Sequence, residues 1–600
     1  MRQSGIATRS GCRNGCPWSV DEAPWSTTTA RPRRAPTRQR NRQLLRVMKN
    51  HKHLAFFFLY AAMPTLCTGI LGVGVSFKWF PVADMLRGLS LDILLFAPMA
   101  LLPQWAALAW IWLLFPVLLG ITLLSSAHLV VYGAGLSRFA IQSVLETSRG
   151  EALEFVSDFS GWGSLAVLAC VMLAVCWSLR QALRHLRGRD ARLQWQAVAV
   201  LCVACVAVVA VGVRKGDRFL ASSTTYMVLK SVGSYAEDME KIDDMRRVRE
   251  KAGFAGVRLL DADDAAPRTY VFVIGESANR NHHSLYGYRR PTNPELSALV
   301  GNGLQVFTDV VSADTHTIPS LRKTLLFNEL DADKDVLARR SLIRLLRDAG
   351  FATYWVSNQT ANSDGLTGTA VLAGDASDTR FLNRARHEGN SVSHDEVLLT
   401  ELSRILADPA PKKAVFLHLI GSHLSYSLRY PAQFDVFTDT PQLAPAPWRN
   451  GQDIGFINAY DNSIRYTDHI VSSVMHAVDA TDTRAFVVYF SDHGQEVYDT
   501  RPIRGQDARN PSRHMVEIPF MCWLSPEYRA ANPDFAAEVA GARARPFSLA
   551  WFAQSGAELA RVAFEGAQPR ESLFDAGYTP GPRLLPNGET YEAMLRRNGQ

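Results

Sequence analysis

The sequence predicts a bundle of α-helices in a membrane, followed by an α/β domain with a central, mostly parallel sheet. Two observations support this fold class. Residues 54–213 are strongly apolar, whereas residues 214–600 have the composition of an ordinary soluble chain. In the second region short apolar strands alternate with helices, which is the pattern of a parallel α/β sheet. A chain of 600 residues is also too long for one small domain.

The first 53 residues form a basic arm that contains the arginine-rich run RPRRAPTRQRNRQLLRVMK. Its Pro, Arg, Ser and Thr content predicts disorder, because such a segment cannot bury enough apolar surface to fold. Lys and Arg beside a membrane span favour the cytoplasmic side. We therefore expect residues 1–53 to be a disordered cytoplasmic arm.

Residues 54–213 contain five apolar segments, and a helix needs about 20 residues to cross a bilayer. The second segment is the weakest, because it carries Arg87 and Asp92. The segments are Leu54–Phe77, about Met85–Leu102, Trp105–Tyr132, Gly161–Leu179 and Trp195–Val213.

The number of spans and the positions of basic residues give the same orientation. The loop RQALRHLRGRDAR between the fourth and fifth segments is basic, as the arm is, so both are expected in the cytoplasm. Five spans then place the C-terminal part outside. A four-span interpretation without the second segment would break this agreement.

Residues 214–260 are predicted to be a linker and residues 261–600 a separate soluble domain. Of the cysteines, only Cys522 lies in this domain, so it cannot contain an internal disulfide. The net charge of +7 comes mainly from the arm and one short loop. Without a basic stripe across the soluble domain, nucleic-acid binding is not expected.

Four buried strands are expected in the soluble domain, together with helices at Ser341–Gly350 and Asn458–Val478. The strands are Thr269–Gly275, Phe351–Ser357, Ala414–Gly421 and Ala485–Phe490.

Polar or metal-binding residues follow each of these strands. They are Glu276 after the first strand, Asn358 and Gln359 after the second, His423 after the third, with His418 inside it, and Asp492 and His493 after the fourth. Sites of α/β sheets gather at the carboxyl ends of the strands, and Glu, Asp and His together suit Zn²⁺. Each residue also has a plainer interpretation, such as a helix cap, a loop residue or a hydrogen-bonded core histidine.

Five stretches resemble one known family. They are VIGESANRNHHSLYGYRRPTNPEL, SADTHTIPSLRKTLLF, HLIGSHLSYSLRYP, YDNSIRYTDHIV and VYFSDHGQEVYDT. They look like the phosphoethanolamine transferases of Gram-negative inner membranes, which are membrane-anchored members of the alkaline phosphatase/sulfatase superfamily. The resemblance spans about residues 54–530 and is greatest to the branch acting on the lipopolysaccharide core. It implies a multi-pass inner-membrane protein with a sulfatase-like catalytic domain in the periplasm.

The resemblance also implies a set of site residues. The zinc ligands would be Glu276, Asp492, His493 and a threonine nucleophile. We choose Thr317, because the TIPSLRKTLLF that follows keeps the family's spacing, with Thr315 as the near alternative.

Further residues would handle the substrate. His423 and His514 match histidines that handle the phosphoethanolamine group, and His418, Glu496 and Asn358 are further candidates for substrate contacts. Gln495 departs from the family, which usually has an acid there, and this puts a second metal position or a substrate contact in doubt.

The implied reaction is a zinc-dependent transfer of phosphoethanolamine from phosphatidylethanolamine to lipopolysaccharide, in its core or lipid A, through a covalent intermediate on threonine. Membrane lipids are expected partners. The alternatives are transfer of another phospho-group, hydrolysis by a related phosphodiesterase, or a non-catalytic membrane protein with a degenerate sulfatase-like domain.

Overall fold

The computed structural model describes most of residues 253–597 and parts of the N-terminal half. The N-terminal parts are residues 58–76, 87–92, 102–132, 162–186 and 223–234, with isolated positions between them. The gaps in the C-terminal part are residues 262–265, 329–338, 360–367, 384–392, 441–445 and 447–448. The predicted arm, residues 1–53, lies outside the described residues.

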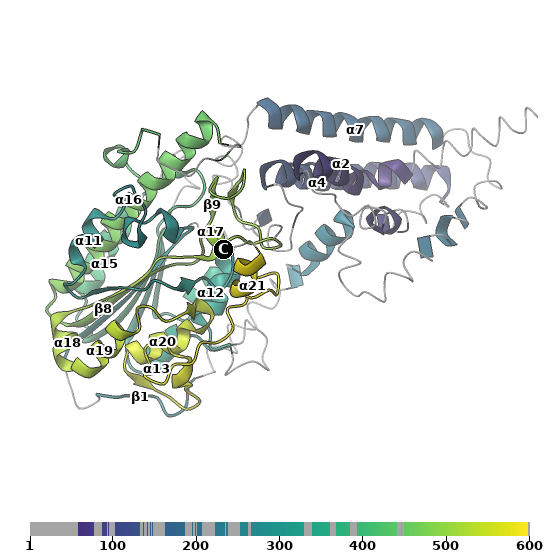
Figure 1. The fold of residues 1–600 in the computed structure, drawn as a ribbon. Helices are drawn as coiled ribbons and strands as arrows, with labels where there is room; N and C mark the ends of the chain where they lie inside the picture. Colours follow the sequence, from purple (N-terminus) through teal and green to yellow (C-terminus); the bar gives the residue numbers. More distant parts are fainter. Residues whose placement is uncertain are drawn as a thin grey trace, which may run out of the picture.

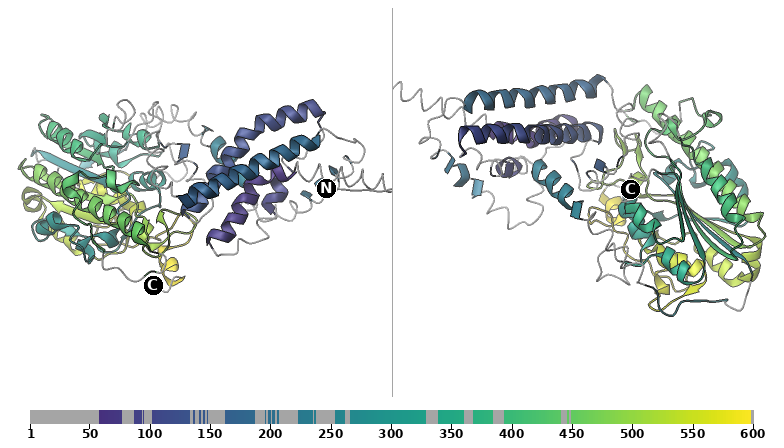
Figure 2. Two further views of the ribbon diagram at one scale, coloured as in Figure 1. Left: turned by 90° about the horizontal axis from the view of Figure 1, so that it is seen from above. Right: turned by 180° about the vertical axis from the view of Figure 1, so that it is seen from behind.

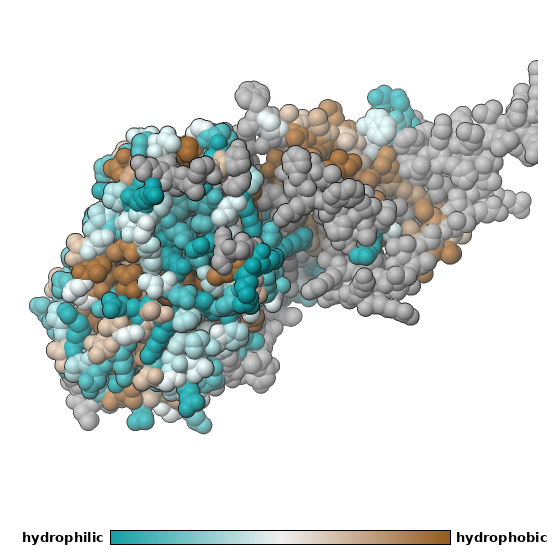
Figure 3. All heavy atoms as spheres, viewed as in Figure 1, coloured by the Kyte–Doolittle hydropathy of each residue, from teal (hydrophilic) through white to brown (hydrophobic). Residues whose placement is uncertain are grey.

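Three apolar helices of the N-terminal half, α2 (Met63–Ser76), α4 (Gln104–Tyr132) and α7 (Trp162–Leu186), run side by side (Figures 1 and 2). Among the described residues, two segments are long and apolar enough to cross a membrane, Trp105–Val130 and Leu165–Arg184. Hydrophobic residues gather on the outside of this part, whereas the visible face of the α/β domain is mostly hydrophilic (Figure 3). The other three predicted spans lie partly outside the described residues.

Asp92 of the weak second segment faces other helices. It is fully buried and accepts hydrogen bonds from the hydroxyls of Thr65, at 2.5 Å, and Ser223. Charged side chains within a membrane bundle usually face its interior and find polar partners there. Ser223 precedes a helix at residues 224–234, so part of the predicted linker 214–260 is helical.

The C-terminal domain is built on a seven-stranded sheet in the order β3-β11-β8-β2-β7-β5-β6. The five strands from β8 to β6 are parallel, and β11 and β3 add an antiparallel edge. The strands are β2 (Arg268–Gly275), β3 (Leu304–Val306), β5 (Ala352–Ser357), β6 (Asp378–Phe381), β7 (Lys412–His418), β8 (Arg484–Ser491) and β11 (Phe520–Leu524). The predicted central, mostly parallel sheet is confirmed.

Helices cover both faces of this sheet (Figures 1 and 2). Side chains of β2 alternate between the two layers, Tyr270 and Phe272 on one side and Val271 and Val273 on the other. The first layer contains α12 (Thr317–Leu325), α13 (Leu342–Asp348) and α20 (Phe552–Leu559), and the second contains α11 (Pro294–Leu299), α15 (Glu396–Leu406) and α16 (Gly451–Asp479).

Shorter elements complete the domain. The helices are α14 (Gly368–Ala373), α17 (Arg513–Val516), α18 (Pro526–Ala531), α19 (Pro533–Gly541) and α21 (Tyr591–Arg597). The paired short strands are β1 (Arg258–Leu259) with β13 (Val562–Ala563), β4 (Val310–Val311) with β12 (Phe547–Ser548), and β9 (Glu496–Val497) with β10 (Arg504–Gly505).

Candidate active site and metal centre

The ends of β2 and β8 bring two carboxylates to one point. Gly275 and Ser491 are paired across these parallel strands, so Glu276 and Asp492 follow at equivalent positions. The backbone then turns sharply at Ser277, whose φ of 59° lies in the left-handed region. The Ser277 N–H donates to Oδ1 of Asp492 at 3.1 Å, which fixes the second carboxylate.

Glu276, Asp492 and His493 form a buried cluster. One possible ligand atom of each residue lies within 4.8 Å of the other two. Nε2 of His493 is 3.3 Å from Oε1 of Glu276 and 3.5 Å from Oδ2 of Asp492. Their side chains are no more than 2% exposed.

The Thr317 hydroxyl reaches this cluster from the first turn of α12. It donates to Oε2 of Glu276 at 3.0 Å and lies 3.3 Å from Nε2 of His493. Ser320, one turn later, donates to the Asp492 carbonyl at 2.5 Å and ties α12 to the end of β8. Thr315 is fully buried, and its hydroxyl lies 2.9 Å from Nδ1 of His316. The geometry therefore brings Thr317, rather than Thr315, to the cluster.

The charges in the cluster favour a cation. Burial and the Glu276 carboxylate raise the pKa of Asp492 to about 8. Burial alone would lower the pKa of His493, but Asp492 and Glu276 raise it to about 9. Oδ2 of Asp492 has no hydrogen-bond partner among the described residues, although it is buried. Two carboxylates, an imidazole and a nearby hydroxyl fit Zn²⁺, which takes oxygen and nitrogen ligands.

Gln359 also contacts the cluster. Its side-chain amide donates to Oε2 of Glu276 at 3.0 Å and to the carbonyl of Leu419 at 3.1 Å. The site prediction named the neighbouring Asn358 instead. Both residues follow β5, and the sequence gives no signal for which of them turns towards β2.

Asn358 supports the loop after β7. Its amide donates to Oδ1 of Asp395 at 2.9 Å. The Asp395 carboxylate also accepts the backbone N–H groups of Ile420 and Gly421, at 2.8 and 2.9 Å. These bonds draw the chain out of the sheet, which is why β7 ends at His418 and not at the predicted Gly421. The substrate contact of Asn358 stays a prediction.

The histidines of β7 and its loop are buried to different degrees. His418 is fully buried, 3.3 Å from the Ser357 hydroxyl, and burial lowers its pKa to about 4, so it is neutral. His423 is partly exposed, and its Nδ1 has no hydrogen-bond partner among the described residues. His423 is therefore the better placed of the two for contact with a substrate.

The predicted residue Glu496 and its neighbour Gln495, near β9, form hydrogen bonds within the protein. The Glu496 carboxylate accepts from the hydroxyl and the N–H of Thr500, at 2.5 and 3.1 Å, and is fully buried. Gln495 donates to the carbonyl of Ser422 at 2.9 Å, and its own side-chain oxygen is buried without a partner among the described residues. The substrate contact of Glu496 stays a prediction.

Gly494 separates the cluster from α17, which carries His514. A Cβ atom on Gly494 would lie 2.3 Å from the His514 carbonyl oxygen. We expect Gly494→Ala to lower the free energy of unfolding by about 1–3 kcal/mol, the usual cost of overpacking, and to reduce activity. Thermal unfolding of the full chain in detergent measures this effect.

Gly455→Ala is the matched control, because no atom lies within 4 Å of a Cβ at this position in α16. We expect this variant to unfold at the same or a higher temperature, since alanine favours helix by about 1 kcal/mol. Equal unfolding temperatures for the two variants would contradict the packing described around Gly494.

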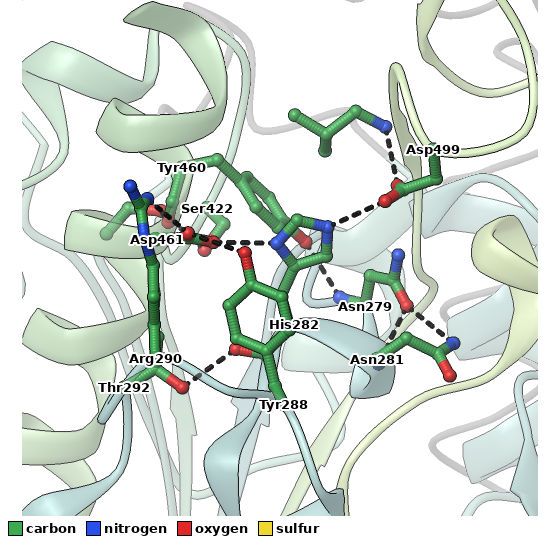
Figure 4. Close-up of polar contacts among 12 residues, drawn as sticks. Asn279, Asn281, His282, Tyr288, Arg290, Thr292, Ser422, Tyr460, Asp461 and Asp499 are labelled. Atoms are coloured by element: carbon green, nitrogen blue, oxygen red, sulfur yellow. Dashed lines mark hydrogen bonds and ion pairs between the residues drawn. The ribbon is translucent and has the colours of Figure 1, made fainter. Parts of the chain in front are cut away.

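A second buried cluster surrounds His282 beside the site (Figure 4). Its Nδ1 lies 2.6 Å from Oδ1 of Asp461, and its Nε2 lies 3.1 Å from Oδ1 of Asp499. Oδ2 of Asp461 accepts from the Tyr288 hydroxyl at 2.8 Å and from Arg290 at 2.7 Å. The site prediction did not include this cluster, although the residues lie in three of the family-like stretches.

The two carboxylates keep His282 charged. Burial alone would lower its pKa, but Asp499 and Asp461 raise it to about 10. Because the folded pKa lies above the unfolded value of about 6.5, this stabilisation is complete below pH 6.5 and is lost as pH rises to 10. Each unit of pKa shift corresponds to about 1.4 kcal/mol.

We therefore expect His282→Gln to unfold at a lower temperature than the wild type near pH 6.5, with a difference that shrinks towards pH 10. Unfolding temperatures of both proteins across this range measure it, and titrations of other groups cancel in the difference. A difference that stays constant with pH would contradict a charged His282.

The fold and the site together define a class. Residues 268–549, which include the mostly parallel sheet and the cluster at its carboxyl edge, match the Sulfatase family, so the domain is of the sulfatase class. The phosphoethanolamine transferase EptC of Escherichia coli is 30% identical over 500 residues, covering 80% of this chain and 84% of the relative. The chain belongs to the phosphoethanolamine transferase family and is an enzyme of that kind.

One more relative and two solved structures are also similar to this chain. Phosphoethanolamine transferase CptA of Salmonella typhimurium is 29% identical over 505 residues, covering 80% of this chain and 84% of the relative. The periplasmic domain of E. coli EptC, solved in complex with Zn, is 34% identical to this chain, with a TM-score of 0.52. The match covers 57% of this chain and 95% of the EptC domain. The integral membrane protein EptA of Neisseria meningitidis shares the fold, at 20% identity and a TM-score of 0.64. The match covers 88% of this chain and 99% of EptA.

Proposed function

We propose that this chain transfers phosphoethanolamine from phosphatidylethanolamine to lipopolysaccharide through a covalent intermediate on Thr317. The observation that carries the proposal is the Thr317 hydroxyl, half-buried and within 3.3 Å of Glu276 and His493. A hydroxyl held between a carboxylate and an imidazole in a transferase of this family is placed to act as a nucleophile.

Glu276, Thr317, Asp492 and His493 would hold a zinc ion. The zinc complex of the E. coli EptC domain supports this assignment, as does the buried Asp492 oxygen that has no hydrogen-bond partner among the described residues. When bound, zinc lowers the pKa of a coordinated hydroxyl and stabilises negative charge on a phosphoryl oxygen.

In the first half-reaction Thr317 Oγ1 forms a bond to the phosphorus of phosphatidylethanolamine. The bond from phosphorus to the diacylglycerol oxygen breaks, and diacylglycerol leaves with the proton that the threonine hydroxyl gives up. His423 is the candidate for carrying that proton, and both His423 and His514 are candidates for contacting the phosphoryl group. The N-terminus of α12, where Thr317 lies, adds a favourable dipole for an anionic group.

In the second half-reaction an acceptor oxygen attacks phosphorus and the threonine hydroxyl is restored. The acceptor gives a proton to Thr317 Oγ1 through the same histidine, His423. A relative named Kdo(2)-lipid A phosphoethanolamine 7''-transferase, from Salmonella typhimurium, supports an acceptor in lipopolysaccharide. We place the acceptor in the core or in lipid A.

The proposed location is the bacterial inner membrane, with five spans and a periplasmic catalytic domain. The two apolar helices and the shared fold of EptA support a membrane anchor. The proposed division is a cytoplasmic arm (1–53), a membrane domain (54–213), a linker with a helix (214–260) and a catalytic domain (261–600). A membrane anchor keeps the site at the surface where its lipid donor lies.

The test uses the purified full chain, phosphatidylethanolamine with a fluorescent acyl chain, and lipopolysaccharide. We expect fluorescent diacylglycerol, together with lipopolysaccharide that has gained phosphoethanolamine by mass spectrometry. Diacylglycerol with free phosphoethanolamine and unchanged acceptor would indicate a phosphodiesterase. No diacylglycerol would overturn the proposed donor.

A further inference from the structure

The side chain of Asn279 has one possible orientation. Its Oδ1 accepts from the backbone N–H of Asn281 at 2.9 Å (Figure 4). Its Nδ2 donates to the backbone carbonyl of Gln495 at 3.3 Å. If the amide were flipped, its NH₂ group would face the Asn281 N–H and its oxygen would face the Gln495 carbonyl, and neither pair can form a hydrogen bond. Asn279 is fully buried, and its own N–H donates to the Tyr460 hydroxyl at 2.7 Å.

The fixed amide decides which nitrogen of His514 carries the proton. Nδ2 of Asn279 also lies 2.9 Å from Nδ1 of His514 and must donate to it. A neutral imidazole whose Nδ1 accepts a hydrogen bond carries its proton on Nε2. No described residue forms a hydrogen bond with this Nε2–H, so it is free to contact a substrate.

His282 keeps a competing carboxylate away from His514. Asp499 Oδ2 lies 3.6 Å from Nδ1 of His514, beyond hydrogen-bond distance. Its Oδ1 is held by Nε2 of His282 at 3.1 Å, and its Oδ2 accepts the Val497 N–H at 3.1 Å. An unrestrained Asp499 could accept a hydrogen bond from Nδ1–H and so favour the opposite tautomer.

We propose that Asn279 is a positioning residue that holds His514 as an Nε2–H donor to the transferred phosphoethanolamine group, and that His282 supports it by restraining Asp499. The inference rests on the role proposed above for His514. An N–H at this position can donate a hydrogen bond to an anionic phosphoryl oxygen without first changing tautomer.

The tautomer is tested directly in the resting protein. The full chain, labelled with ¹⁵N-histidine, is compared with a His514→Gln variant, which identifies the His514 signals. We expect an unprotonated Nδ1 and a protonated Nε2. If the neutral His514 ring carries its proton on Nδ1, the inference is overturned, whether or not the protein transfers phosphoethanolamine.

The catalytic consequence is tested with two Asn279 variants. Asn279→Ser keeps an oxygen near the Asn281 N–H but cannot reach His514, and we expect transfer to fall about 10-fold or more in kcat with little change in KM. Asn279→Asp presents an oxygen to Nδ1, so Nε2 keeps its proton only while His514 is an imidazolium. The ratio of variant to wild-type kcat should therefore fall as pH rises.

A double-variant comparison separates positioning from structure. In a His514→Ala background, we expect Asn279→Asp to cause no further loss of transfer, because its effect acts through the missing imidazole. Additive losses, or a kcat ratio independent of pH, would overturn the positioning role. A wild-type chain that makes no diacylglycerol would instead overturn the proposed function, while the NMR result still decides the tautomer.

Discussion

Replacing Thr317 with alanine should abolish the covalent intermediate and reduce transfer by about 1,000-fold or more, since the nucleophile is lost. The Thr317 hydroxyl is the one that contacts both Glu276 and His493 among the described residues. Intact mass spectrometry of the full chain after mixing with phosphatidylethanolamine measures the intermediate directly. The wild type should gain the mass of one phosphoethanolamine group and the variant none.

Thr315→Ala is the matched control for this experiment. It removes a hydroxyl of the same kind, two residues earlier, whose partner is His316. We expect this variant to retain the intermediate, and Thr317→Ser to retain it in part because serine keeps a hydroxyl. A mass gain in Thr317→Ala equal to that of the wild type would contradict Thr317 as the nucleophile.

Replacing Asp492 should remove zinc as well as activity. One buried oxygen of its carboxylate has no hydrogen-bond partner among the described residues. The other accepts the N–H groups of Ser277 and His493, at 3.1 and 2.7 Å. Asp492→Ala loses both the metal ligand and the hydrogen-bond acceptor, so we expect the variant to be less stable and free of zinc. Elemental analysis of the purified full chain measures the metal content.

Asp492→Asn separates these two effects. The amide oxygen can still accept the two N–H groups, so the variant should unfold close to the wild-type temperature. The negative charge is lost, so zinc affinity should fall by about 100-fold or more, since charged ligands supply much of the attraction. A stable Asp492→Asn protein with wild-type zinc content would contradict Asp492 as a ligand.

Much of the site follows from features that the sequence displays. Glu276 and Asp492 directly end two apolar strands, and parallel strands in register place such residues side by side. The choice of Thr317 over Thr315 came from a resemblance and not from a physical signal. The structure adds that residue 317 lies in the first turn of α12 and points to the cluster.

Other features depend on contacts that span the whole sequence. Asn358 and Gln359 both follow β5, and only the packing of Leu419 and Glu276 decides that Gln359 turns inward. The ion cluster at His282 joins residues separated by 179 and 217 positions, so no local pattern marks it. Long-range pairing of this kind is set by the tertiary fold.

The ends of helices and strands also depend partly on local sequence and partly on long-range contacts. α16 begins at Gly451, seven positions before the predicted start at residue 458, because Asn450 and Asp453 form a capping box. Both cap residues are visible in the sequence as an Asn followed three positions later by an Asp. The antiparallel edge formed by β11 and β3 was not predicted, since its pairing needs contacts between residues more than 200 positions apart.

We propose that Glu276, Thr317, Asp492 and His493 hold one zinc ion, which makes an alcohol reactive towards a phospholipid. Anomalous scattering at the zinc absorption edge, from crystals of the zinc-loaded full chain, locates this ion. The expected result is a single strong peak within about 2.0–2.3 Å of a ligand atom from each of the four residues. A peak at another place in the protein, or one that leaves Thr317 outside coordination distance, would contradict the claim.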